Sequence, residues 1–404
     1  MELIDKQSPF QPEEPVKPEN FQGRKEIIEK YLPYIKQSAN GNSQHFFITG
    51  KRGMGKTSLA AYLNEYAKHK YQMVGVHILN DGVHNVESII KQIVERILNE
   101  IQEESWADKI INEFENHVEK VGFFGTTIKF KNNEKKLVEN IKDNFAVFLN
   151  DIAKEFSDKK GILIILDDIN GLTESPEFAN WYKSFADTMA TTYRGESPVT
   201  MILASYPEKL EALYNHNPSF NRIFKHSTVE ELSDEEVKDF FTKTFDKVNI
   251  SIEEEALDFM VHFSSGLPNM MQEIGDGVFW NNYDEMIDKN DAYQGIIRAG
   301  NEIGEKYLKP ILDSSIRSDE YLTIFKKLGA DFGKSVIGKE YIFKKRDFVE
   351  KLTQHEAKVF QDFLRRARAL KIIEFSGAKK SGYYKFTSNL YPVFFMIEAM
   401  KEKY

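Results

Sequence analysis

The chain has 404 residues, of which 41% are hydrophobic and 29% are charged, a composition typical of a globular protein with two to four domains. It has no cysteine and no apolar run near the ~20 residues that span a membrane, which excludes a disulfide framework, a thiolate metal site and a transmembrane helix and favours a cytoplasmic location. The net charge of -9 divides into +7 over residues 313–404, which hold 19 Lys and Arg against 12 Asp and Glu, and -16 over the remainder, so we expect the C-terminal segment to contact a polyanion.

The first 230 residues predict an α/β domain that follows a short arm. Residues 1–20 hold four of the twelve prolines among polar residues, which predicts an extended arm or a disordered tail. Beyond the arm, apolar runs alternate with helical patterns. Strands are predicted at 45–50, 73–79, 161–168, 199–205 and 223–229, helices at 25–35, 59–67, 86–120, 136–157 and 176–190, and an extended insertion at 122–131. This alternation predicts a parallel sheet covered on both faces, over a domain at 21–230.

From Leu232 the pattern is helical, which predicts an α-helical domain at 231–312. Two capping boxes, Ser233-x-x-Glu236 and Ser251-x-x-Glu254, are each expected to open a helix. Gly266-Leu267-Pro268 is expected to end one helix and start the next.

The basic segment 313–404 predicts a winged helix. Helices are expected at 321–328 and 346–352, and Thr353-x-x-Glu356 is a capping box that opens a third. The runs KIIEFSG and YYKFTSN then predict a β-hairpin.

A basic face on the third of these helices predicts contact with duplex DNA. Ala357, Phe360, Leu364 and Ala367 share one face, and a polar face opposite carries basic residues. The cations expected to contact DNA are Lys358, Arg365 and Arg368 on the helix and Lys379 and Lys380 at the hairpin tip. The alternatives are a face that is merely hydrated and a face that contacts protein.

The run GKRGMGKTS (50–58) fits the phosphate-binding pattern G-x-x-x-x-G-K-[ST]. Glycines let backbone N–H groups approach a polyphosphate, and the helix that follows points its N-terminus at the anion. We expect Lys56 to reach the β- and γ-phosphates of ATP and Thr57 to bind Mg²⁺. The residues expected to cradle the nucleotide are Gly50, Gly53, Met54, Gly55, Lys56, Thr57 and Ser58.

A second motif, ILIILDDIN (162–170), is an apolar strand that ends in two acids. Asp167 is expected to hold Mg²⁺, and Asp168 to activate the attacking water. Ser205, at the end of the next predicted strand, is placed to sense the γ-phosphate. An ordinary polar strand end is the alternative for Ser205.

In order along the chain, these motifs resemble those of the AAA+/STAND class of P-loop ATPases (the ASCE group), and more narrowly the archaeal-type ATPases related to origin-recognition proteins. Phe21-Gln22-Gly23-Arg24 resembles the opening motif of that family, which implies that Arg24 lies near the adenine. Ser205 corresponds to the first sensor. Gly266-Leu267-Pro268 resembles the G-x-P motif of the family's helical lid, which implies a lid at 231–312 with Pro268 at the nucleotide.

The resemblance also implies homo-oligomers in which Arg222 serves as an arginine finger, although a surface or lid-anchoring role stays open for it. Two departures stand out. Asp168 replaces the usual glutamate, which predicts slow turnover, and Asn269 replaces the arginine that often follows the lid proline.

The predicted function is a slow, Mg²⁺-dependent ATPase that binds ATP and ADP, acts as a nucleotide-controlled switch and binds duplex DNA through its winged helix. One alternative is a STAND-like signalling or defence ATPase whose winged helix contacts an unknown protein partner. Another is a P-loop scaffold with vestigial hydrolysis.

Overall fold

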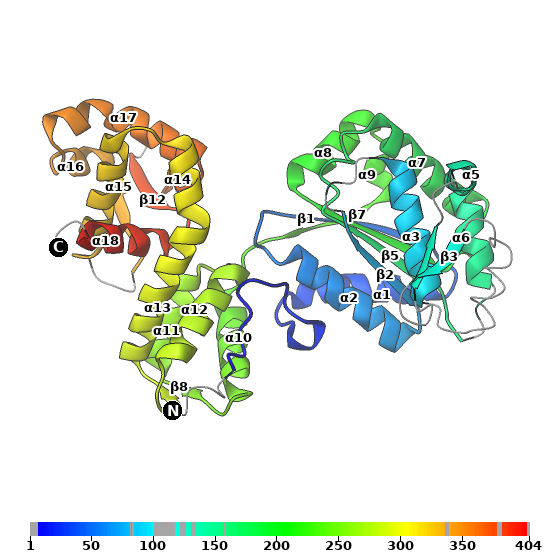
Figure 1. The fold of residues 1–404 in the computed structure, drawn as a ribbon, viewed down its shortest axis with the longest axis horizontal. Helices are drawn as coiled ribbons and strands as arrows, with labels where there is room; N and C mark the ends of the chain where they lie inside the picture. Colours follow the sequence, from blue (N-terminus) through cyan, green and yellow to red (C-terminus); the bar gives the residue numbers. More distant parts are fainter. Residues whose placement is uncertain are drawn as a thin grey trace. The chain divides into compact units, whose positions relative to one another are not determined.

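The computed structural model describes residues 7–80, 82, 85–100, 118–121, 127–130, 135–154, 156, 158–335, 339–377 and 382–401. The chain forms two compact units (Figure 1). Pro15–Glu230 makes the first, here called the core unit, and Met1–Glu14 together with Glu231–Tyr404 makes the second, here called the helical unit. The chain therefore passes between the units twice, at 14–15 and at 230–231.

The core unit is built on a five-stranded parallel sheet in the order β2-β5-β6-β1-β7. The strand at its centre, β6, pairs with β1 and β5, and all six residues of β5 are buried. All five strands were predicted, four of them from apolar runs, so the predicted α/β fold with a parallel sheet is confirmed. The strands are β1 (Gln44–Gly50), β2 (Val74–Leu79), β5 (Ile162–Asp167), β6 (Val199–Ser205) and β7 (Lys225–Val229).

Helices cover both faces of this sheet (Figure 1). Helices α1 and α2 pack on one face, and α3, α7 and α8 on the other. Because both faces are covered, the central strands β5 and β6 are buried along their whole length, whereas the edge strand β7 (Lys225–Val229) alternates between exposed and partly buried residues before the buried Val229. The helices of the core unit are η1 (Pro18–Asn20), α1 (Lys25–Ala39), α2 (Lys56–Tyr71), α3 (Val86–Glu100), α5 (Lys135–Asp143), α6 (Phe145–Lys154), α7 (Pro176–Thr191), α8 (Pro207–His216) and α9 (Phe220–Ile223).

The insertion between α3 and α5 differs from the prediction. The helix expected through residue 120 is wrong at its end, because β3 (Val118–Val121) pairs antiparallel with β4 (Thr127–Phe130). Cross-strand pairing here overrides the helical pattern. The extended segment expected at 122–131 is confirmed at β4. The helix expected at 136–157 is divided at Asn144, whose side-chain amide donates to the Asn140 carbonyl at 3.1 Å.

The helical unit joins a helical bundle to a segment with a three-stranded antiparallel sheet in the order β10-β12-β11. The predicted hairpin is confirmed as β11 and β12, whereas β10 was not predicted. The elements are α10 (Asp234–Asp246), β8 (Ser251–Ile252), α11 (Glu254–Ser264), α12 (Pro268–Asn281), β9 (Met286–Ile287), α13 (Lys289–Ile303), a π-helical turn η3 (Gly304–Leu308), α14 (Lys309–Ser315), α15 (Asp319–Phe332), β10 (Ile342–Lys344), α16 (Lys345–Val349), α17 (Gln354–Ala369), β11 (Ile373–Phe375), β12 (Tyr383–Phe386) and α18 (Tyr391–Lys401).

Two of the three predicted capping boxes form, at Ser233–Glu236 and at Thr353–Glu356. The box predicted at Ser251 is wrong. Ser251 lies in β8, where its hydroxyl donates to the Glu285 carbonyl at 3.1 Å, and α11 begins after Glu253 without a side-chain cap. Ser251 therefore pairs with β9 as part of a strand and does not cap α11 as the motif had predicted.

The N-terminal arm packs onto the helical unit, so a disordered tail is the wrong alternative for residues 7–14. Phe10 is 4% exposed, and its ring centroid lies 4.8 Å from that of Phe245. The backbone N–H of Gln11 donates to the Gln272 side chain at 2.8 Å. A Cβ on Gly275 of α12 would lie 2.2 Å from Phe10, so this glycine leaves the space that the ring fills.

No helix in the described ranges combines the length and the apolar character that a membrane crossing requires.

Candidate nucleotide-binding site

The loop between β1 and α2 has the conformation that phosphate binding requires. Gly53 and Gly55 both have a φ of 80°, in the left-handed region that favours glycine. Gly50, at the end of β1, has no room for a side chain, because a Cβ there would lie 2.8 Å from the Val229 carbonyl oxygen. All three predicted glycines are therefore needed by the backbone itself, and α2 begins directly after them at Lys56.

Lys56 is held inside this loop. Its Nζ donates to the Gly50 carbonyl at 2.8 Å and to the Lys51 carbonyl at 3.0 Å, and lies 4.8 Å from the centroid of the Tyr206 ring. Burial lowers the pKa of Lys56, whereas the negative charges of Asp167, Asp168 and Glu208 oppose that shift. The ammonium group is thus placed where the loop and the acids at the end of β5 meet.

The two acids at the end of β5 lie in different environments. Asp167 is 1% exposed, and one of its carboxylate oxygens accepts the Asp168 backbone N–H at 2.9 Å. Its other oxygen lies 3.4 Å from His77 Nε2, on the neighbouring strand β2. Asp168 is exposed and has a φ of 57°, a left-handed conformation that Asp tolerates better than most residues. The buried acid suits a fixed ligand role, and the exposed acid suits contact with water.

Asn170 connects Asp168 to Ser205. The Asn170 side-chain amide donates to the Asp168 carboxylate, and the Ser205 hydroxyl donates to Asn170 Oδ1 at 2.7 Å. Ser205 ends β6 and is 1% exposed. The structure therefore brings together Lys56, Asp167, Asp168 and Ser205, which the sequence had placed on three separate elements.

Arg24, which directly precedes α1, contacts the glycine loop between β1 and α2. Its side chain donates to the Met54 carbonyl at 3.1 Å and to the Glu230 carbonyl, and the residue is 8% exposed with a φ of 60°. Adenine contact by Arg24 stays a prediction. Ser58 accepts the Val16 backbone N–H at 3.2 Å, so its hydroxyl already ties the arm to the start of α2.

The remaining predicted site residues lie on three helices. Thr57 is the second residue of α2 and is half-buried. Arg222 is exposed on α9. Pro268 is the first residue of α12, in the helical unit. Their roles stay predictions.

The donors at this site fit Mg²⁺. The Thr57 hydroxyl and the Asp167 carboxylate are hard oxygen ligands, the kind that Mg²⁺ prefers when phosphate oxygens and water complete its shell. The fixed Asp167 carboxylate, held by the Asp168 N–H, is consistent with a ligand that needs a set direction.

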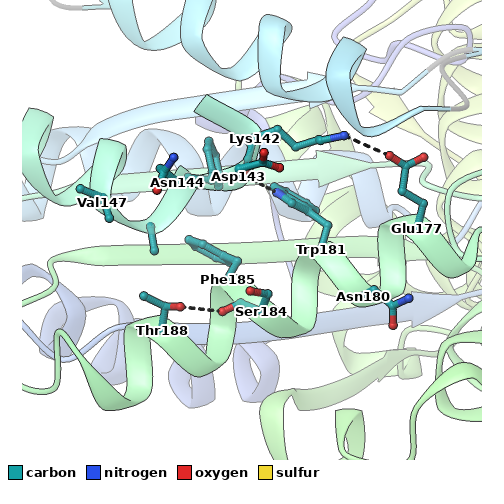
Figure 2. A pocket seen from close by; sticks show the side chains of 12 residues that line it. Lys142, Asp143, Asn144, Val147, Glu177, Asn180, Trp181, Ser184, Phe185 and Thr188 are labelled. Atoms are coloured by element: carbon teal, nitrogen blue, oxygen red, sulfur yellow. Dashed lines mark hydrogen bonds and ion pairs between the residues drawn. The ribbon is translucent and has the colours of Figure 1, made fainter. Parts of the chain in front are cut away.

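A separate pocket lies in the core unit, between the α5–α6 segment and α7 (Figure 2). Trp181 and Phe185 form its apolar part, and Trp181 Nε1 donates to the Lys142 carbonyl at 3.2 Å. None of the predicted site residues lines it. The polar network around the glycine loop therefore remains the better candidate for chemistry.

Four residues of the network were not predicted from the sequence: His77, Asn170, Tyr206 and Glu208. Asn170 and Tyr206 each lie within two residues of a predicted site residue, so proximity in the chain was a usable signal. No signal in the sequence indicated His77, because it reaches Asp167 only through the pairing of β2 with β5.

We compared the chain with known protein families, curated proteins and solved structures. Residues 20–183 match the family described as AAA ATPase domain. No curated protein matches the chain. Among solved structures, the Walker-type ATPase of Pyrococcus abyssi is similar with a TM-score of 0.53 and 15% identity, over 96% of this chain and 99% of that one. The ORC2 protein of Aeropyrum pernix, solved as ADPNP–ADP complexes, is similar with a TM-score of 0.56 and 13% identity, over 97% of each chain.

At identities of 13% and 15%, the solved structures establish only the fold of the chain, whereas the family match identifies the type of domain at residues 20–183. The resemblance predicted from the motifs is therefore confirmed at the level of the domain: residues 20–183 match the AAA ATPase domain family, and the chain has the fold of the solved Walker-type ATPase and ORC2 structures.

Proposed function

We propose that this protein binds ATP with Mg²⁺, hydrolyses it slowly and uses the bound nucleotide to control an interaction of its C-terminal segment with duplex DNA. The observation that carries the first part is the glycine loop itself, in which Gly53 and Gly55 adopt left-handed φ values around a half-buried Lys56 that faces two acids. Few other functions need that combination.

Each residue has a distinct role in this proposal. Backbone N–H groups of the loop and the Lys56 ammonium bind the phosphates, and Thr57 and Asp167 hold Mg²⁺. Bound Mg²⁺ supplies charge neutralisation of the phosphates. Asp168, exposed beside the buried Asp167, accepts the proton of the attacking water. Ser205 donates to the γ-phosphate, and the shorter reach of Asp168 compared with glutamate keeps turnover slow.

Nucleotide binding by the whole protein tests this part. With Mg²⁺ present, ATP at 100 times its Kd should stabilise the protein by about 2.7 kcal/mol against unfolding. Lys56→Ala should remove this stabilisation, because the phosphates lose their cation. Lys70→Ala, at an exposed position of the same helix, is the matched control. Stabilisation by ATP that survives Lys56→Ala would contradict the proposed site.

Hydrolysis is tested separately at Asp168. Asp168→Asn should abolish phosphate release and leave ATP binding intact, because the amide cannot accept the proton. Unchanged hydrolysis would refute the role of Asp168, and binding without any hydrolysis in the wild type would favour the vestigial scaffold.

We further propose that α15, α16, α17 and the three-stranded sheet form a winged helix whose exposed basic residues contact DNA phosphates. Lys358 and Arg365 are exposed on α17, although Arg365 also pairs with Asp362 at 2.9 Å. Arg368 is a weaker candidate than the sequence suggested. Its guanidinium carbon lies 4.1 Å from the centroid of the Phe375 ring, and its Nε is buried. Lys379 and Lys380 lie outside the described residues.

Salt dependence of duplex binding tests the DNA part. Affinity should fall steeply with salt, and Lys358→Glu with Arg365→Glu should weaken binding and reduce the log–log salt slope by about 2. Lys36→Glu with Lys70→Glu changes the net charge equally on exposed positions of α1 and α2 and should have no such effect. If duplex DNA does not bind even at ~50 mM salt, the alternative of a signalling ATPase with a protein partner is favoured.

Assembly is the last part of the proposal. The exposed position of Arg222 on α9 suits an arginine finger supplied to a neighbouring copy. Light scattering with and without ATP and DNA should show assembly that depends on ATP, and Arg222→Ala should lower hydrolysis without lowering ATP binding. A monomer under all conditions would exclude this role.

A further inference from the structure

Asn170 contacts two groups of the proposed active site at once. Its side-chain amide donates to the Asp168 carboxylate, and its Oδ1 accepts the Ser205 hydroxyl at 2.7 Å. Asn170 lies in the loop after β5, and Ser205 ends the neighbouring parallel strand β6. The contact therefore crosses from one strand end to the next.

The loop that carries Asn170 is fixed by its backbone. The Ile169 N–H donates to the Ala204 carbonyl at 3.3 Å, and the Thr173 hydroxyl donates to the Asn170 carbonyl at 3.2 Å. Ile169 and Thr173 are fully buried. The backbone of Asn170 is thus held by contacts that do not involve the side chains of Asp168 or Ser205.

The chemistry of the three groups sets the direction of both hydrogen bonds. An ionised carboxylate only accepts, so the amide nitrogen of Asn170 must face Asp168. The amide oxygen then faces Ser205, whose hydroxyl must donate its single hydrogen to it. The Ser205 hydrogen can go either to Asn170 or to a phosphate oxygen, but not fully to both.

We propose that Asn170 is a positioning residue that couples the γ-phosphate sensor Ser205 to the catalytic base Asp168. This inference rests on the ATPase function proposed above. The donor end of Asn170 orients the Asp168 carboxylate, and its acceptor end holds the Ser205 hydroxyl until a γ-phosphate competes for it. When Ser205 turns its hydrogen to the phosphate, the amide loses one partner and is free to adjust its hold on Asp168.

The two ends can be separated by substitution. Asn170→Asp keeps an acceptor for Ser205 but replaces the donor to Asp168 with a second negative charge. Asn170→Ala removes both ends. If the role of Asn170 is purely structural, both variants should lose kcat and nucleotide preference in the same way. If its two ends have separate roles, the two variants should differ in nucleotide preference.

The experiment measures kcat and KM for ATP and, independently of turnover, the affinities for ADP and for a non-hydrolysable ATP analogue. Asn170→Ala should lower kcat roughly 10–100-fold with KM within about twofold, since a misplaced base affects chemistry more than binding. It should also alter the preference for the analogue over ADP. Asn170→Asp should lower kcat comparably and keep the wild-type preference.

Coupling also predicts that the effects are not additive. Adding Ser205→Ala to Asn170→Ala should lower kcat by clearly less than the product of the two single effects, because the bond between Asn170 and Ser205 that both substitutions remove is lost only once. Asn144→Ala, at the α5–α6 break, is the matched control and should behave as wild type, and thermal unfolding of every variant should match the wild type.

Two outcomes would overturn the inference: wild-type kcat in Asn170→Ala, or full additivity with Ser205→Ala. Failure of the proposed function looks different, because the wild type itself would then neither bind nor hydrolyse ATP.

Discussion

Phe10 offers a direct test of how the N-terminal arm contributes to the helical unit. Its side chain is buried among Phe240, Phe241 and Phe245, with ring centroids 5.9, 6.4 and 4.8 Å away. Replacing a buried Phe by Ala costs about 3–5 kcal/mol in protein cores. The other contacts of the arm include Gln11 with Gln272 and a solvent-exposed ion pair between Glu13 and Lys306 at 3.3 Å, so we expect the arm to detach in this variant instead of leaving a cavity. We therefore expect Phe10→Ala to cost about 3 kcal/mol, at the lower end of that range.

Calorimetry of the full chain measures this loss. For a unit of this size, about 2–4 °C of Tm is lost per kcal/mol, so the transition of the helical unit should fall by about 6–12 °C. Phe10→Leu keeps most of the apolar volume and should lose far less. If Phe10→Ala melts within about 1 °C of the wild type, the arm does not contribute to this core and the reasoning fails.

Two further predictions concern stability. Burial, with a smaller contribution from the charge of Lys225, lowers the pKa of His45 to about 4 from 6.5. Because the unfolded chain binds a proton at His45 at a higher pH than the folded chain does, the free energy of unfolding is unaffected by His45 above pH 6.5. It decreases as the pH falls from 6.5 to 4, by about 3 kcal/mol in all. Urea unfolding measured against pH should show a flatter profile for His45→Gln, and equal profiles would contradict the burial. In α15, a Cβ on Gly329 would lie 2.3 Å from the Phe395 backbone, so Gly329→Ala should cost about 1–3 kcal/mol even though Ala has the better helix propensity. A Cβ on Gly333 would meet mainly the flexible Met396 side chain, so Gly333→Ala should be nearly neutral in the same denaturation assay.

Much of the core unit could be predicted because its signals are local. A run such as ILIIL is long, apolar and bounded by polar residues, and a strand buried on both faces needs little else. Phe10 shows the opposite case. One aromatic residue in a proline-rich segment has no periodicity, and its partners lie more than 200 residues away. Ser251 shows a third case, in which a local capping signal is overridden by a distant strand.

The same distinction explains what could be predicted of the site. The glycine loop and the two acids of β5 are contiguous motifs, so the sequence indicated them directly. Their mutual approach follows from parallel strands whose carboxyl ends share one edge of the sheet. The contacts of Asn170 and His77 depend on side-chain directions at that edge, which no spacing rule supplies. Arg368 was assigned to the basic face by its helical spacing, but its contact with Phe375 depends on where β11 lies.

The double passage of the chain between its two units has a consequence for synthesis. The side chains that enclose Phe10 belong to residues 240–275, so they emerge from the ribosome more than 200 residues after residues 7–14. The core unit can therefore complete its sheet before the side chains that bury Phe10 have been synthesised. A fragment that starts at residue 231 would lack part of its own interior, and a synthetic peptide of residues 1–14 added in trans should restore it.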